Sequence, residues 1–303
     1  MKKNFIISTD SCCDHFKSYL DKHNVYCIIL KRILNGKEFV ELYDSVEEFD
    51  NFYEDLKKGA LPTTSLLNTI ELQEYFESIL RVESQGDIIH VCLSSGLSAT
   101  YGNAVRAAET VNAATKSGRK VYVIDSLIGT HGMSMQVDRL IEMRDSGMTS
   151  AAAVKKIEDL RDHQQGWVIM SDLFHLKRGG RIGGVQAAIG SVLGIKPIIV
   201  LNREGKLAIE NKMRGAGNAI DYLLAKMKEL GVNHGTDFSK SCVYIVRTSK
   251  SKLYDDFLAA ALRKYPKMKY TERIVGPIIG THLGCGGMCI LFEGAERVDV
   301  KAK

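Results

Sequence analysis

Residues 87–105, DIIHVCLSSGLSATYGNAV, join a short apolar run to a serine-rich turn and the start of a helix. The run Asp87–Leu93 has the length and composition of a buried strand, and a helical pattern extends from about Ala99 to Ala113. Two further apolar runs, Phe5–Ser8 and Lys120–Ile124, are also followed by helical patterns. Strands that alternate with helices predict a parallel sheet covered by helices, in the Rossmann-like α/β class.

The second half of the chain has a different pattern. The apolar runs Pro197–Leu201 and Lys206–Glu210 flank a turn, which predicts a hairpin. Helical patterns lie near residues 185–194, 216–230 and 251–264. Hairpins mixed with helices predict an α+β domain with a mostly antiparallel sheet. We therefore predict an N-terminal α/β domain over residues 1–163 and a C-terminal α+β domain over residues 164–303.

Composition and charge exclude several classes of protein. Apolar residues make up 45% of the 303 positions, which excludes a disordered chain, and a net charge of +5 is too weak to indicate nucleic acid. No run approaches the roughly 18–20 apolar residues that span a bilayer, so we expect no stable membrane insertion. Ser8 interrupts the first apolar run, which argues against an export signal and for a cytoplasmic location. The seven scattered cysteines form no C-x-x-C pair, which favours reduced thiols without zinc.

Hydroxyl and acidic residues recur where the predicted strands of the first half end. They occur at Thr9–Ser11, Ser94–Ser98 and Asp125-Ser126, and Thr63–Ser65 precedes a helical pattern in the same way. The carboxyl ends of parallel strands share one edge, where ligands bind beside helix N-termini. A carboxylate or phosphate suits such a site. Helix capping favours the same residue types and is the alternative explanation for each cluster.

The segment Gly96–Thr100 is similar to the G-x-S-x-G turn of serine hydrolases, with Ser98 as the nucleophile. Its last position is threonine instead of glycine, which weakens the steric argument. Asp125 and His282 would complete the order serine, aspartate, histidine. An acyl hydrolase is therefore an alternative hypothesis.

Two segments of the second half combine glycines with polar groups. His175–Arg181 places three cations beside two glycines, which suits an anion, although a solvated turn is the commoner explanation. Gly276–Gly284 is interpreted as a loop in which His282 could contact a ligand. His282 and Cys285 lack the companion spacing of zinc ligands, so we expect no metal. The apolar stretch Gly183–Ile195 indicates a core helix or a surface for a long apolar tail.

Taken together, these motifs resemble the DegV family of bacterial fatty-acid-binding proteins. The segments that carry the resemblance extend over nearly the whole chain: Thr9–Asp14, Thr64-Ser65, Ser94–Tyr101, Ile124–Ser126, Leu176–Ile182, Ile195–Ile198 and Gly276–Gly284. The resemblance implies two domains with one long-chain fatty acid between them. It also implies a carrier without catalysis or cofactor of its own. Such a carrier presents the acid to a separate fatty acid kinase, whose acyl phosphate enters phospholipid synthesis.

The resemblance also implies roles for individual residues. The carboxylate-binding set is Thr64, Ser65, Ser94, Ser95, His282 and Arg181. The residues expected along the tail are Ile189, Leu193 and Ile279. The residues expected to dock the kinase are Lys177, Arg178, Lys212 and Arg214.

The sequence departs from the family pattern at a few positions. Leu66-Leu67 replaces Gln-Pro, Ala99 replaces glycine, and Cys285 replaces proline. These changes alter loops near the expected pocket and leave the head-group ligands in place. A carrier of another acidic amphiphile is a further alternative, because tunnel shape is a tertiary property.

Overall fold

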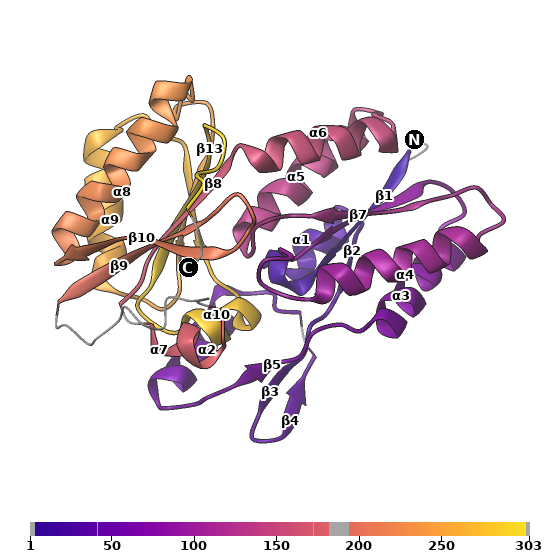
Figure 1. Cartoon of the computed structure of the whole chain (residues 1–303), viewed down its shortest axis with the longest axis horizontal. Helices are drawn as coiled ribbons and strands as arrows, with labels where there is room; N and C mark the ends of the chain where they lie inside the picture. Colours follow the sequence, from indigo (N-terminus) through magenta and orange to yellow (C-terminus); the bar gives the residue numbers. More distant parts are fainter. Residues whose placement is uncertain (1–3, 41, 172, 182–193, 301–303) are drawn as a thin grey trace. The chain divides into compact units, whose positions relative to one another are not determined.

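The computed structural model describes residues 4–40, 42–171, 173–181 and 194–300. Its contacts divide the chain into two compact units (Figure 1), of which the first comprises residues 1–45 and 64–161 and the second residues 46–63 and 162–303. The chain passes from the first unit to the second between Arg161 and Asp162, two residues before the predicted boundary at residue 163. Residues 46–63, assigned by the prediction to the N-terminal domain, pack within the second unit.

The first unit is built on a parallel sheet of order β2-β1-β6-β7. This confirms the Rossmann-like prediction for the first half. Its strands are β1 (Phe5–Asp10), β2 (Val25–Ile28), β6 (Asp87–Cys92) and β7 (Val121–Asp125). Its helices are α1 (Lys17–Lys22), α3 (Thr69–Val82), α4 (Thr100–Ala114), α5 (His131–Asp145) and α6 (Ser150–Asp162). A 3₁₀ turn, Ser11–Cys13, follows β1 directly.

Local sequence signals explain several of these elements. Asn68 caps α3, and its side chain and that of Glu71 each accept the other's main-chain N–H at 2.9 Å. Asn35 and Gly36 both have positive φ, as a tight hairpin requires between β3 (Arg32–Leu34) and β4 (Lys37–Phe39). These two strands and β5 (Thr63–Thr64) form a small sheet of order β4-β3-β5.

The second unit has a six-stranded sheet of order β10-β9-β8-β13-β11-β12. All neighbours are antiparallel except β11 and β12, which confirms the predicted mostly antiparallel sheet. Its strands are β8 (Gln164–Ile169), β9 (Ile195–Leu201), β10 (Leu207–Arg214), β11 (Val243–Arg247), β12 (Tyr270–Ile274) and β13 (Met288–Glu293). Its helices are α2 (Val46–Lys57), α7 (Phe174–Arg178), α8 (Ala216–Leu230), α9 (Lys252–Lys264) and α10 (Pro277–Leu283).

An apolar core stabilises the second unit. Trp167 on β8, Leu223 on α8 and Phe257 on α9 are all fully buried within it. Leu223 lies on the inner face of α8 with Ile220 and Met227, at the three- and four-residue spacing of an amphipathic helix. Burial of these faces holds α8 and α9 against the sheet.

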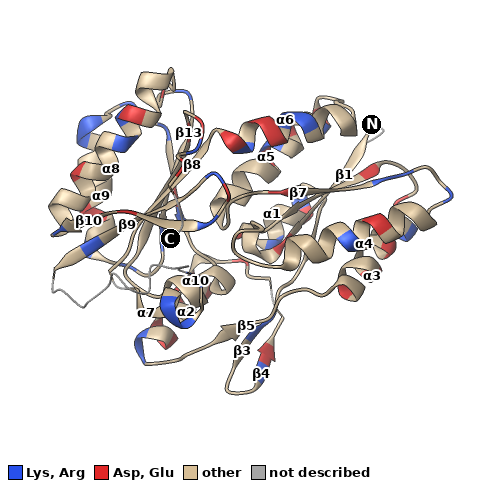
Figure 2. Cartoon of the chain, in the orientation of Figure 1, with Lys and Arg blue, Asp and Glu red and all other residues tan. Residues whose placement is uncertain are grey.

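The helices carry acidic and basic residues interspersed along α4, α6 and α8 (Figure 2). Ion pairs one helical turn apart also occur on α9, between Lys252 and Asp256 at 2.6 Å, and on α5, between Arg139 and Glu142 at 3.0 Å. Such exposed pairs contribute little to stability. Among the helices that the structure describes, none combines the length and the apolar composition needed to cross a bilayer.

Candidate functional site

Two aspartates organise the carboxyl edge of the parallel sheet in the first unit. Asp10 ends β1, and its two oxygens accept the main-chain N–H of Cys12 at 2.9 Å and of Leu93 at 2.7 Å. Asp125 ends β7 and accepts the N–H of Ser95 at 3.0 Å and of Leu127 at 3.1 Å. Both carboxylates therefore fix the loops that follow the strands. For Asp10 and Asp125 this agrees with the alternative explanation, in which such residues accept main-chain N–H groups instead of binding a ligand.

The loop after β6 presents Ser94 and Ser95 from this edge. Ser94 is fully buried, and its N–H donates to the Ile128 carbonyl at 3.1 Å. Its hydroxyl oxygen accepts the N–H of Gly96 at 3.1 Å. Ser95 is exposed, and its backbone is held by Asp125. Hydrogen bonds therefore hold the main chain of the loop at both serines, and Ser95 is the one whose side chain lies at the surface.

The segment that carries Thr64 and Ser65 is attached to the same region. Leu67, just after it, donates its N–H to the Thr100 hydroxyl at 3.4 Å, and Asn103 donates to the Leu67 carbonyl at 2.7 Å. Thr100 opens α4, directly after the Ser94–Ala99 loop. The structure thus brings the segments of the predicted hydroxyl ligands in the first unit to the first turns of one helix.

Ser98 has a local polar partner. Its hydroxyl contacts the Thr100 hydroxyl at 2.9 Å and accepts the Thr100 N–H at 3.2 Å. These contacts place Ser98 in the cap of α4. They do not show the hydrogen bond to a histidine that activates a serine nucleophile.

The loop after β7 stores backbone strain that the sequence did not reveal. Leu127 and Thr130 both have φ near +50°, a conformation that is costly for residues with a β-carbon. The Thr130 hydroxyl donates to Asp14 at 2.6 Å, and the Gln136 amide donates to the Ser126 carbonyl at 3.0 Å. This network holds the loop that in turn holds Ser94.

In the second unit, the Gly276–Gly284 segment forms a helix. The loop interpretation was wrong: Pro277 occupies the first turn of α10, where its missing N–H costs nothing, and Gly284 ends the helix with φ of 73°. His282 lies in the last turn of α10. A β-carbon on Gly179 would come within 2.3 Å of His282 Nδ1, so only glycine permits this approach of the basic segment.

The surroundings of His282 set its protonation. Burial, followed by the positive charges of Arg181 and Arg178, lowers the pKa of His282 to about 4. The imidazole is therefore neutral near pH 7 and can act as a hydrogen-bond donor or acceptor, but not as a cation. Arg181 is exposed and close enough to His282 to supply the positive charge that the imidazole lacks.

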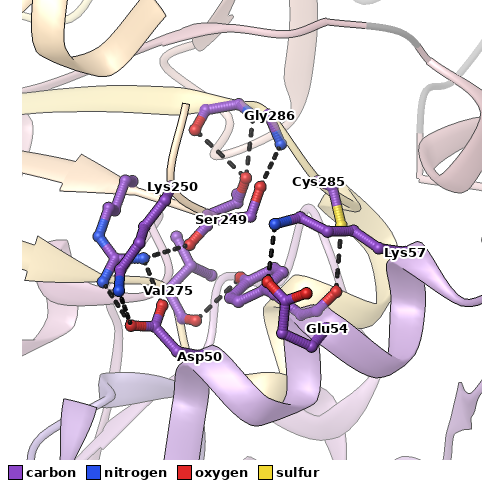
Figure 3. A network of polar contacts seen from close by, with 12 residues as sticks. Asp50, Glu54, Lys57, Ser249, Lys250, Val275, Cys285 and Gly286 are labelled. Carbon is purple, nitrogen blue, oxygen red and sulfur yellow. Dashed lines mark hydrogen bonds and ion pairs between the residues drawn. The ribbon is translucent and has the colours of Figure 1, made fainter. Parts of the chain in front are cut away.

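A polar clamp fastens α2 to the chain on either side of α10 (Figure 3). Asp50 accepts from the Arg247 guanidinium at 2.6 and 3.1 Å and pairs with Lys250 at 3.6 Å. The buried Tyr53 donates its hydroxyl proton to the Val275 carbonyl at 2.9 Å, and the Cys285 thiol donates to the Tyr53 carbonyl. Burial acts to raise the pKa of Asp50, but Arg247 and Lys250 outweigh it and leave that pKa lowered.

Close packing completes the attachment of α10 to α2. A β-carbon on Gly280 would lie 2.5 Å from the Tyr53 hydroxyl oxygen and 2.8 Å from the Phe52 ring. No sequence motif marks α2 as part of this site. The signal available was its apolar spacing, Phe49, Phe52, Tyr53 and Leu56, which marks a buried helical face without naming its partner.

The family model described as "Uncharacterised protein, DegV family" matches residues 4–294. The chain belongs to the DegV family. A DegV domain-containing protein of Caldanaerobacter subterraneus is 30% identical over 287 residues, which cover 95% of this chain and 98% of that protein.

Two solved structures of DegV proteins are similar to this chain in both sequence and fold. One is described as DegV, a fatty acid binding protein from Bacillus subtilis, and the other as a DegV lipid binding protein from Thermotoga maritima. Each is 25% identical with a TM-score of 0.78, and each match covers 97% of this chain and 100% of the solved chain. The two-unit architecture is therefore that of DegV proteins.

Departures from the DegV pattern have visible local consequences. Leu67 is buried and anchored to α4, whereas Leu66 is about half exposed. Ala99 is exposed at the cap of α4 and supplies no side-chain cap. Cys285 replaces the rigidity of proline with a hydrogen bond to the Tyr53 carbonyl.

The remaining predicted residues lie in separate elements. Lys177 and Arg178 are exposed on α7, although Arg178 also donates to the Pro62 carbonyl at 2.5 Å. Lys212 and Arg214 are exposed on the edge strand β10. Ile279 is half-buried on α10. Ile189 and Leu193, and the predicted helix near residues 185–194, lie outside the described residues apart from Gly194.

Proposed function

We propose that this chain binds one long-chain fatty acid. The observation that carries the proposal is its relation, over 97% of its length, to DegV proteins from Bacillus subtilis and Thermotoga maritima that are described as binding fatty acid or lipid. The polar groups of both units support it, because a carboxylate taken out of water needs several hydrogen-bond donors or a cation.

The carboxylate ligands in this proposal are the hydroxyls of Thr64 and of Ser94 or Ser95, with Ser65 beside them, together with His282 and Arg181. Ser95 supports the assignment because its side chain is exposed on a loop whose main chain Asp125 holds. His282, neutral at pH 7, contributes one N–H, and Arg181 contributes the charge. Hydrogen bonds to a charged group contribute about 1.5–3 kcal/mol each.

The apolar tail supplies most of the affinity in this proposal. Each buried methylene contributes about 0.8 kcal/mol, so a long chain gains far more from burial than its head group gains from one hydrogen bond. Ile279 on α10 is the described tail candidate; Ile189 and Leu193 complete the proposed set.

A second step follows from the first. We propose that the bound acid is presented to a separate ATP-dependent fatty acid kinase in the bacterial cytoplasm, and that the acyl phosphate enters phospholipid synthesis. Lys177, Arg178, Lys212 and Arg214 are the proposed docking residues. Their exposure supports the role, and in this step the carrier itself supplies no catalytic group.

Titration with a fatty acid and with the corresponding alcohol tests the binding site. The Ser95→Ala variant removes one exposed hydroxyl, and we expect the acid to bind about tenfold more weakly, with little change for the alcohol. Ser98→Ala is the matched control, since its hydroxyl contacts only Thr100 among the residues described. Unchanged acid affinity in both Ser94→Ala and Ser95→Ala would contradict the carboxylate assignment.

The same variants separate the carrier from the hydrolase alternative. A carrier does not cleave an activated acyl ester. A hydrolase cleaves the ester in the wild type and loses that activity in Ser98→Ala. Turnover that depends on Ser98 would therefore replace the proposal with the hydrolase hypothesis.

The docking proposal has a separate test. Lys177→Glu reverses an exposed charge and should reduce kinase-dependent acyl phosphate formation while fatty-acid affinity stays unchanged. Lys177 is preferable to Arg178, because Arg178 also holds the Pro62 carbonyl. Normal acyl phosphate formation in Lys177→Glu, Lys212→Glu and Arg214→Glu alike would exclude this docking surface.

A further inference from the structure

One face of the parallel sheet in the first unit gathers three different metal-ligating side chains. The register of β1 and β6 pairs Ser8 with His90 and Thr9 with Val91, so Asp10 and Cys92 follow as neighbours. A carboxylate oxygen of Asp10, a ring nitrogen of His90 and the sulfur of Cys92 all lie within 4.8 Å of one another. All three side chains are fully buried.

The histidine of this cluster is oriented through one ring nitrogen. Nδ1 of His90 lies 2.9 Å from the Ser8 hydroxyl, which in turn lies 2.8 Å from the Tyr75 hydroxyl. The Phe76 ring contacts the imidazole edge to face at 5.2 Å. Among the described residues, the buried Nε2 has no hydrogen-bond partner. A ring fixed through one nitrogen, with the other open, is the arrangement of a metal-ligating histidine.

A second thiol adjoins the cluster. The thiols of Cys12 and Cys92 both lie in hydrogen-bonding reach of the Asp10 carboxyl group. The carboxyl group itself is fixed by the N–H groups of Cys12 and Leu93. Each carboxylate oxygen has two lone pairs, so these hydrogen bonds leave capacity for a metal.

We propose that Asp10, His90 and Cys92 bind one Zn²⁺ ion, and that the Cys12 thiol, which adjoins Asp10 but lies outside the group of atoms within 4.8 Å of one another, shifts to become the fourth ligand. Thiolate sulfur, imidazole nitrogen and carboxylate oxygen are the ligand atoms that Zn²⁺ takes in proteins, and thiolate ligands disfavour Mg²⁺ and Ca²⁺. Binding displaces the thiol protons to solvent, so two thiolates and one carboxylate face a doubly charged ion and the neutral imidazole. Ser8 and Tyr75 are the outer residues that orient the histidine.

The sequence does not show this site because its ligands are separated along the chain. Asp10 and Cys12 are two positions apart, as are His90 and Cys92, but 80 positions separate the two pairs, and the pairing of β1 with β6 brings them together. The ion would tie β1 to β6 where the loops of the carboxyl edge begin. The proposal is independent of fatty-acid binding.

The test uses Zn²⁺ and Co²⁺ with the full chain. We expect purification without chelators to yield one zinc per chain by elemental mass spectrometry. Replacement by Co²⁺ should give thiolate-to-cobalt charge-transfer absorption. Cys12→Ser with Cys92→Ser should abolish that absorption, whereas Cys289→Ser, a buried cysteine of β13 in the other unit, should keep it. Ser8→Ala should weaken Zn²⁺ binding by about tenfold or more, since outer-shell losses have that size.

Two results would overturn the proposal. One is a metal-free protein that gains neither cobalt absorption nor thermal stability when Zn²⁺ or Co²⁺ is added; the cluster is then a hydrogen-bonded buried network only. The other is equal metal content in the double cysteine variant and in Cys289→Ser. The titration of the unmodified chain decides the question even where the double variant does not fold.

Discussion

The two units hold their ligand-facing segments by different means. In the first unit, Asp10 and Asp125 bind main-chain N–H groups, so the loops that carry Ser94 and Ser95 are fixed by neutral donors. In the second unit, α10 is fixed by the charged pair Asp50–Arg247 and by glycines that allow close contact. The loops of the first unit therefore need only an oxygen that accepts hydrogen bonds, whereas the position of α10 in the second unit depends on a charged pair and on close packing.

The largest difference between the two units should appear in the free energy of unfolding when an aspartate in each is replaced by the uncharged asparagine. Asp50→Asn should lower the free energy of unfolding by about 3 kcal/mol, because it leaves Arg247, only 13% exposed, without its anion. Asp125→Asn keeps an amide oxygen for the same N–H donors and should cost less than about 1 kcal/mol. Urea unfolding of both variants measures the contrast, and equal losses would contradict it.

Acid should destabilise the second unit through His282. Its pKa is about 4 in the folded chain against an ordinary 6.5, so its stabilising contribution is complete above pH 6.5 and is lost as the pH falls toward 4. We expect a loss of about 2 kcal/mol over that range. The His282→Gln variant should unfold with a correspondingly flatter pH dependence; an unchanged slope would refute this prediction.

A smaller loss of stability should follow when a methyl group is added where α10 packs closely on α2. Gly280→Ala adds a methyl group against Tyr53 and Phe52 and should destabilise the chain by about 1–2 kcal/mol. Gly217→Ala on α8 is the control: it meets nothing within 4 Å and should stabilise by up to about 1 kcal/mol. The midpoint temperature of thermal unfolding should fall in Gly280→Ala and rise in Gly217→Ala. A loss of stability in Gly217→Ala as well would contradict the prediction, because steric overlap at Gly280 would then not explain the difference between the two glycines.

Much of the fold was predictable because its signals are local. The Asn35-Gly36 turn, the Asn68 cap and the alternation of strands with helices each depend on a few adjacent residues. The α10 helix was missed because its seven residues lie between glycines and include another, Gly280. A helix so short has too few turns to show a pattern, and tertiary packing on Tyr53 stabilises it.

The residue types of the candidate site could be predicted from the sequence, but the contacts that hold its elements in place could not. Ser94 could be placed at the carboxyl edge of the parallel sheet because the ends of parallel strands share an edge, whereas Thr64 lies in β5 of the small sheet β4-β3-β5. The attachment of α2 could not be predicted, since Asp50 and Arg247 are separated by 197 positions and no local pattern links them. The strain at Thr130 is also invisible in the sequence, because a β-branched residue at positive φ contradicts its own propensity.

The most direct test of the central claim is mass spectrometry on the organic extract of the denatured, purified protein. The proposed carrier function predicts one long-chain fatty acid in near-stoichiometric amount, which would also identify the chain length. An extract without lipid, from a protein that also fails to bind added fatty acids, would contradict it.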